Sequence, residues 1–227
     1  METTNNETPN NDGSKNNYVN IDAFILAVNT ALNNANHPEI EPLLTRRGYN
    51  PDSIATAKPM VANLETLHQK QKLEYGEQYE ATQTYNKDWD KLNAIYAEHV
   101  ELARIIFDND LNNYIQLGLK GKRKQSFSGY MQQAKLFYAN ALKDPNVTSK
   151  LAKKGIELSE LKETQLLIEQ VETEKYKQNK ETGEAQQATK DRDEAYDSLT
   201  EWFSEFKRTA IVALSSKPQL GKILGFK

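Results

Sequence analysis

The chain has 227 residues, a formal net charge of −3 and no cysteine. These values exclude disulfide bonds, cysteine nucleophiles and cysteine metal ligands, and they give no global field that would attract nucleic acid or a membrane surface. Hydrophobic residues make up 37% of the chain and charged residues 27%. That balance is typical of amphipathic helices, in which only one stripe of each helix is apolar.

Residues 1–18 are almost entirely polar and rich in Asn and Thr. A segment of this composition buries too little apolar surface to fold, so we expect a disordered polar tail. The segment lacks the apolar stretch of a secretory signal, and no window of the chain approaches the 18 apolar residues of a membrane span. We therefore expect a cytoplasmic protein.

From residue 24 onward the sequence resembles itself. Residues 24–120 align with residues 131–227 at a constant offset of 107 without a gap, and 21 of the 97 aligned pairs are identical. Unrelated sequences of ordinary composition would match at roughly one position in sixteen. We predict a tandem duplication of a helical-bundle unit of about 107 residues. The expected boundaries are repeat 1 at 19–117, a basic linker at 118–127 and repeat 2 at 128–227.

Each repeat begins with a predicted amphipathic helix. In repeat 1 it covers about residues 21–34, where apolar residues recur at spacings of three and four. Its counterpart in repeat 2 starts after Ser128. A short helix follows in each repeat, with Pro38 and Pro145 at the first helical position, where proline is well tolerated.

Two glycines are predicted to end the short helices. Gly48 follows a pair of arginines and Gly155 follows a pair of lysines. Glycine after the last helical turn readily adopts a left-handed conformation, and cations there meet the negative end of the helix dipole. We interpret both glycines as structural caps. An anion site at the basic pairs is the alternative.

The longest predicted helical stretch in each repeat has an apolar stripe at each end and a polar middle containing Gly76 or Gly183. We predict a helical hairpin in each repeat, with its turn between about 75 and 86 and between about 182 and 193. One unbroken helix through each glycine is the alternative. The side chains expected in the core are Ile54, Val61, Leu64, Leu92, Leu161, Ile168, Leu199 and Phe203.

No segment shows the alternation of a strand, so the predicted fold class is all-α. Each repeat would hold a short helix and about three longer ones. The period and signature residues of tetratricopeptide, HEAT and spectrin repeats do not fit this chain.

The sequence offers little for catalysis or metal binding. Glu65 and His68 have the spacing of a di-metal carboxylate motif, but the aligned residues of repeat 2 are Glu172 and Lys175. His99 directly follows Glu98, which is the wrong spacing. Motifs for nucleophilic catalysis and for nucleotide binding are absent from the sequence. We assign no catalytic, cofactor-binding or metal-binding residue and expect no cofactor.

The predicted linker contains a cluster of positive charge formed by Lys120, Lys122, Arg123 and Lys124. Four cations in five residues could contact phosphates or an anionic lipid surface. A solvated linker is the simpler interpretation.

The sequence therefore favours a non-enzymatic interaction or scaffold protein of the cytoplasm, built from two helical repeats and binding an unknown protein partner. The first alternative is a weak nucleic-acid or anionic-surface binder that uses Lys120–Lys124, although we do not expect nucleic-acid binding. The second is an unrecognised helical-bundle enzyme. The sequence does not predict the oligomeric state.

Overall fold

The computed structural model describes residues 20–226, so the predicted disordered tail at 1–18 lies outside the described residues. These residues form two compact units. Unit 1 contains the described residues up to Lys70 and from Lys190 onward, and unit 2 contains Gln71–Thr189. The described part of the chain is helical and contains no strand, which confirms the predicted all-α class.

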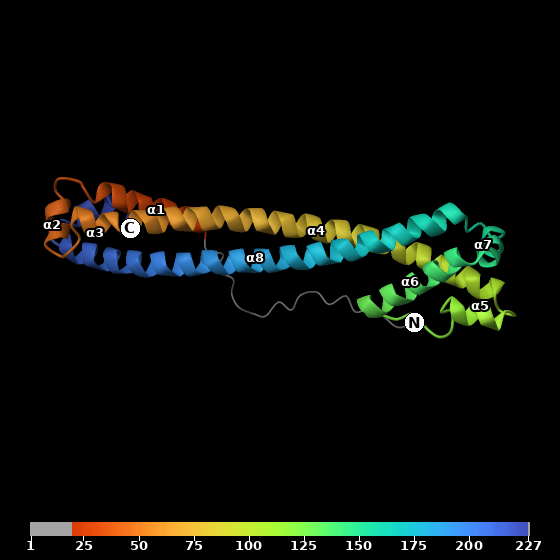
Figure 1. The fold of residues 1–227 in the computed structure, drawn as a ribbon. Helices are drawn as coiled ribbons and strands as arrows, with labels where there is room; N and C mark the ends of the chain where they lie inside the picture. Colours follow the sequence, from red (N-terminus) through yellow and green to blue (C-terminus); the bar gives the residue numbers. More distant parts are fainter. Residues whose placement is uncertain (1–19, 227) are drawn as a thin grey trace. The chain divides into compact units, whose positions relative to one another are not determined.

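The elements follow one another in a simple order along the chain (Figure 1). They are α1 (Ile21–Asn34), α2 (Glu41–Thr45), α3 (Pro51–Ala55), α4 (Ala57–Ile106), α5 (Leu111–Gln116), α6 (Phe127–Lys143), α7 (Pro145–Ala152), α8 (Leu158–Ala213) and the 3-10 helix η1 (Pro218–Lys222). The first helix has the predicted bounds. Each of the two long helices contributes residues to both units.

The predicted hairpins are wrong, because α4 and α8 continue as helices through Gly76 and Gly183. At 50 residues, α4 alone is about 75 Å long. In unit 2 its polar stretch lies antiparallel to that of α8. Gln170 donates to Asp88 at 2.6 Å, and the Lys175 ammonium lies 4.8 Å from the centre of the Tyr85 ring. The polar middle is therefore one side of a two-helix seam, where we had predicted a turn.

Prolines set several helix boundaries. Pro145 occupies the first position of α7 as predicted, and Asp144 caps that helix. Pro38 does not begin a helix, because α2 starts at Glu41, so that prediction is wrong. Pro59 lacks the N–H that would bond to the carbonyl of Ala55. We attribute to it the break between α3 and α4.

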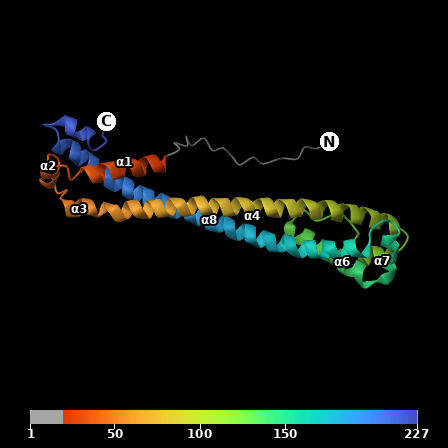
Figure 2. The same ribbon diagram turned by 90° about the horizontal axis from the view of Figure 1, so that it is seen from above.

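Unit 1 is held by α1, α2, α3, the first turns of α4, the last turns of α8 and η1. Phe24 of α1 makes edge contacts with Tyr196 and Phe203 of α8, with ring centroids 4.9 and 5.9 Å apart. The Asn34 side chain donates to the carbonyl of Ile223 at 2.6 Å. Figure 2 shows α1 beside the final turns of α8. This core thus joins the beginning of the described chain to its end.

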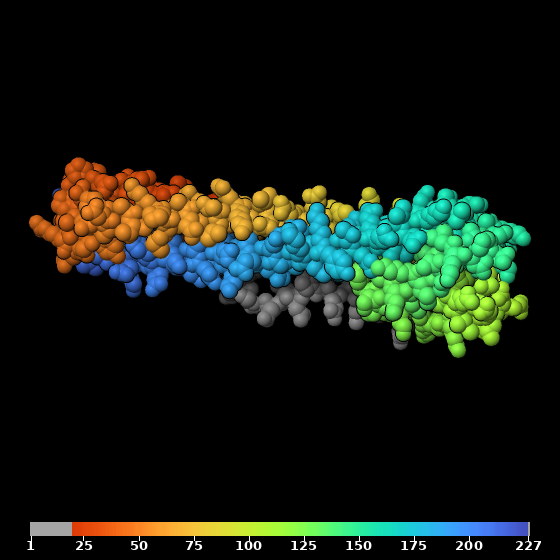
Figure 3. All heavy atoms as spheres, viewed as in Figure 1, coloured from red at the N-terminus to blue at the C-terminus, as the bar shows by residue number. Residues whose placement is uncertain are grey.

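Unit 2 is held by the second half of α4, by α5, α6 and α7, and by the first half of α8. Tyr96 of α4 makes edge contacts with Tyr130 and Phe137 of α6, at centroid distances of 5.3 and 5.9 Å. In the space-filling view, the atoms of α6 and of the start of α8 meet without a gap on the face shown (Figure 3). A second aromatic-rich core therefore lies around α6.

The predicted apolar stripes lie in these two cores. Seven of the eight side chains expected in the core are buried: Ile54, Val61, Leu64, Leu92, Leu161, Ile168 and Leu199. Phe203 is only partly buried, because it lies at the edge of the unit 1 core beside Phe24 and Phe226.

Candidate functional site

The two predicted cap glycines both have left-handed backbones. Gly48 follows α2 with φ of 90°, and Gly155 follows α7 with φ of 88°. The residue after each glycine donates back across the helix end, Tyr49 to the carbonyl of Leu44 and Ile156 to that of Leu151. This hydrogen bonding is that of a helix C-terminus closed by its own backbone.

The basic segment is held to unit 2 by its backbone and by one of its cations. Arg104 donates to the carbonyls of Leu119 and Gly121 at 3.2 and 2.6 Å, and the Arg123 guanidinium lies 3.4 Å from the Asn93 side-chain oxygen. Lys120, Lys122 and Lys124 are exposed, whereas Arg123 is half-buried. The structure therefore brings together three of the four predicted cations at the surface and turns the fourth toward α4.

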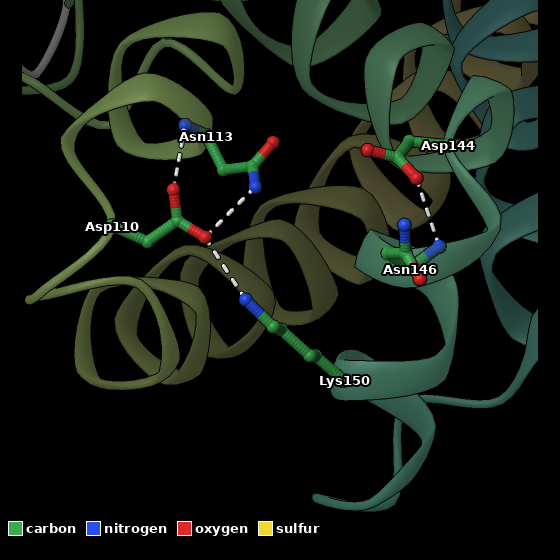
Figure 4. A network of polar contacts seen from close by, with 5 residues as sticks. All are labelled: Asp110, Asn113, Asp144, Asn146 and Lys150. Atoms are coloured by element: carbon green, nitrogen blue, oxygen red, sulfur yellow. Dashed lines mark hydrogen bonds and ion pairs between the residues drawn. The ribbon is translucent and has the colours of Figure 1, made fainter.

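A second group of charges joins α5 to α7 (Figure 4). Asp110 caps α5 by accepting from the backbone and side chain of Asn113, and it forms an ion pair of 2.9 Å with Lys150 of α7. The Asn113 and Lys150 hydrogen bonds lower the pKa of Asp110 to about 2. Nearby, Asp144 accepts from the Asn146 backbone at 2.8 Å. All of these groups satisfy helix ends, so we interpret the network as structural.

A buried polar group lies in the unit 2 core, on three helices. The Nδ1 atom of His99 on α4 is 2.9 Å from the Tyr138 hydroxyl on α6, and its Nε2 atom is 3.3 Å from a Glu160 oxygen on α8. His99 is only 2% exposed. Burial lowers the pKa of His99, and Glu160 opposes that shift. The imidazole is thus held neutral with partners on both nitrogens, and it is too enclosed to meet a substrate.

The residues of unit 1 that align with His99 and Tyr138 are apolar. His99 corresponds to Phe206 and Tyr138 corresponds to Ala31, and both of these lie in the unit 1 core. The two cores therefore differ in chemistry at both aligned positions. Sequence reasoning set His99 aside because it looked for a ligand nearby in sequence, and Glu160 is 61 residues further along the chain.

The seam of α4 and α8 in unit 2 contains three carboxylates that sequence reasoning missed, which we call the glutamate cluster: Glu74, Glu181 and Glu184. One oxygen from each lies within 4.8 Å of the others. Glu181 is only 6% exposed. Its Oε1 accepts from the Lys180 ammonium at 3.3 Å, whereas its buried Oε2 has no hydrogen-bond partner.

The glutamate cluster combines both aligned segments. Glu74 and Glu181 are identical residues at equivalent positions, 107 apart. Both occupy the inward side of the seam, where a two-helix pair normally places apolar side chains. The identity of Glu74 and Glu181 was visible in the alignment. The antiparallel contact that brings them together was not.

A further pair of equivalent positions is apolar and exposed. Ile105, near the end of α4, is 70% exposed, and Val212, near the end of α8, is 59% exposed. Val212 lines a shallow surface hollow together with Glu205, Arg208 and Thr209. The residues aligned with these are Ile105, Glu98, Glu101 and Leu102. Units 1 and 2 thus each present a large apolar side chain at aligned positions of the sequence.

Comparisons with known proteins find no match for this chain among protein-family models, curated proteins or solved structures. Within the described residues, no helix is long and apolar enough to cross a membrane.

Proposed function

We propose that this chain is a non-enzymatic interaction protein of the cytoplasm, built by duplication of one helical segment of about 107 residues. Each half of the duplication would supply one binding position for another protein. The observation that carries the proposal is the pair Ile105 and Val212, which are equivalent in the alignment and similarly exposed.

The order of elements supports the duplication. The series α1, α2, α4 and α5 corresponds to α6, α7, α8 and η1 at the offset of 107. Backbone conformation agrees at two aligned glycine pairs. Gly48 and Gly155 have φ of 90° and 88°, and Gly118 and Gly225 have φ of 68° and 78°.

The exposed pair supports binding because large apolar side chains on a surface gain free energy when a partner covers them. Both are flanked by an acidic residue seven positions earlier, Glu98 and Glu205. A partner helix presenting an apolar anchor with a neighbouring cation would complement either position. Two equivalent positions predict two partner copies per chain.

The test is affinity capture with the purified full chain, followed by mass measurement of the complex. Ile105→Ser with Val212→Ser should abolish capture, and Val212→Ser alone should reduce the captured partner from two copies per chain to one. Leu166→Ser is the matched control, since Leu166 is 64% exposed and its aligned residue is Pro59. Equal capture by the double variant, or loss of capture with the Leu166 variant, would refute the proposal.

A further inference from the structure

We propose that the glutamate cluster binds one divalent cation with hard oxygen-ligand preference, with calcium as the best fit. This inference concerns unit 2 alone and does not depend on the partner-binding positions described above. It is based on the position of Glu74, Glu181 and Glu184, on the burial of Glu181 and on the missing partner of the Glu181 Oε2 atom.

The charge balance of the cluster is incomplete. Within the described residues, the Lys180 ammonium forms ion pairs with two of the three carboxylates, at 3.3 Å from Glu181 and 2.8 Å from Glu184. The Lys180 side chain is 63% exposed to solvent. A buried carboxylate oxygen without a partner is costly, and the Oε2 atom of Glu181 is such an oxygen. A metal ion would supply the missing positive charge.

The coordination habits of the two ions favour calcium over magnesium. One oxygen from each glutamate lies within 4.8 Å of the other two, and calcium–oxygen distances of about 2.3–2.6 Å let one ion bridge such a group. Calcium accepts an irregular, flexible shell of oxygen ligands. Magnesium needs near-ideal octahedral geometry and gives up its waters reluctantly, so three carboxylates extending from two packed helices suit it less well.

The ligand chemistry and solvent access also agree with calcium. The three ligands are carboxylates, with neither histidine nor cysteine to select zinc or copper. Glu184 has a side chain 45% exposed, so water can complete the coordination shell. Lys180 competes for the same oxygens, and the ion would have to displace it. We therefore expect weak affinity, with Kd of about 10⁻⁴ to 10⁻³ M, as in the weaker calcium modules.

The experiment is calorimetric titration of the chelator-treated full chain with CaCl₂, with MgCl₂ as the comparison and the melting temperature as a second measurement. We expect one calcium ion per chain, bound more tightly than magnesium. Glu74→Gln and Glu181→Gln should each weaken calcium binding at least tenfold. Lys180→Gln should strengthen it, because the competing ammonium is removed.

Glu80→Gln is the matched control, since it removes the same charge from an exposed position of α4 and should leave calcium binding unchanged. The Glu181 variant also separates loss of binding from loss of folding. Because a buried carboxylate is costly and its partner Lys180 is exposed to solvent, removing the Glu181 charge should leave the metal-free protein at least as stable as the wild type. Absence of saturable calcium binding would overturn the proposal. So would binding that Glu181→Gln leaves unchanged or that Glu80→Gln weakens equally.

Discussion

At the residue scale, His99 couples the unit 2 core to pH. Its two ring nitrogens lie beside Tyr138 and Glu160, and burial lowers its pKa below the ordinary value of about 6.5. In the unfolded chain the same imidazole is solvated. Between the lowered folded pKa and about 6.5, the unfolded chain therefore binds more protons than the folded one. The free energy of unfolding must rise with pH across that window and fall on acidification.

We predict that His99→Gln flattens this pH dependence. Glutamine does not titrate, so the variant should lose the slope that His99 contributes, which is at most about 1.4 kcal/mol per pH unit. Urea unfolding of the wild type and the variant, measured at several pH values from 7 downward, gives both slopes. Parallel curves for the two proteins would show that His99 has the same proton affinity folded and unfolded.

The glycines give a second prediction at this scale, because the two aligned pairs differ in backbone conformation. A β-carbon at Gly48 or Gly155 meets no atom within 4 Å but must accept positive φ. Replacement of either by Ala should therefore destabilise the protein by roughly 1–2 kcal/mol. Gly76 and Gly183 lie inside helices with open space around them. Replacement of either by Ala should stabilise by roughly 0.5–1 kcal/mol.

Chemical denaturation of the four single variants measures these free energies. The contrast within the set is the control, since each variant adds the same methyl group. Destabilisation by Gly76→Ala or Gly183→Ala would indicate that the helix is interrupted at those positions. Unchanged stability of the Gly48 and Gly155 variants would contradict the left-handed caps.

At the scale of elements, local sequence signals predicted individual helices well, but they did not predict the contacts between helices that are distant in sequence. The apolar spacing of 21–34 and the proline and aspartate at the start of α7 determine those helices locally, and both were predictable. The polar stretch around Gly76 was misread as a turn. A helix with few apolar residues persists there because α8 pairs with it in unit 2, through contacts such as that of Asp88 with Gln170.

The glutamate cluster and the partners of His99 were not predicted, because they also depend on contacts between residues that are distant in sequence. Glu74 and Glu181 are far apart in sequence, and only the antiparallel seam brings them together. His99 likewise finds Tyr138 and Glu160 on other helices. The basic segment was visible because its cations are adjacent in sequence, but the contact that turns Arg123 toward Asn93 was not.

The basic segment gives the next prediction. Replacement of the exposed Lys120, Lys122 and Lys124 by Gln should leave the melting temperature nearly unchanged, because exposed charges contribute little to stability. The net charge of −3 opposes polyanions beyond the segment, so we expect neither wild type nor variant to shift a nucleic acid in gels at physiological salt. Salt-sensitive binding by the wild type, with a slope reduced by about three counterions in the variant, would instead favour the nucleic-acid alternative.

At the scale of the whole molecule, each compact unit combines a part of both proposed repeats, and the two units do so reciprocally. Unit 1 combines the first part of repeat 1 with the last part of repeat 2, and unit 2 combines the last part of repeat 1 with the first part of repeat 2. Leu199 and Phe206 of α8 complete the core around α1, and the equivalent residues Leu92 and His99 of α4 complete the core around α6. Under the proposed duplication, each unit therefore draws on both repeats, and neither unit is made from one repeat alone.

This reciprocity predicts how the isolated repeats behave. A fragment 19–117 lacks α8, and in the full chain the cores of unit 1 and unit 2 each draw on residues of α8 as well as of α4. Each fragment should therefore bury its apolar residues by pairing with a second molecule, and 19–117 mixed with 128–227 should form a one-to-one complex. Light scattering after size-exclusion chromatography measures these masses, and circular dichroism measures the helix content. Stable helical monomers of either fragment would show that a single repeat closes on itself, and they would remove the reciprocal exchange as a requirement of the fold.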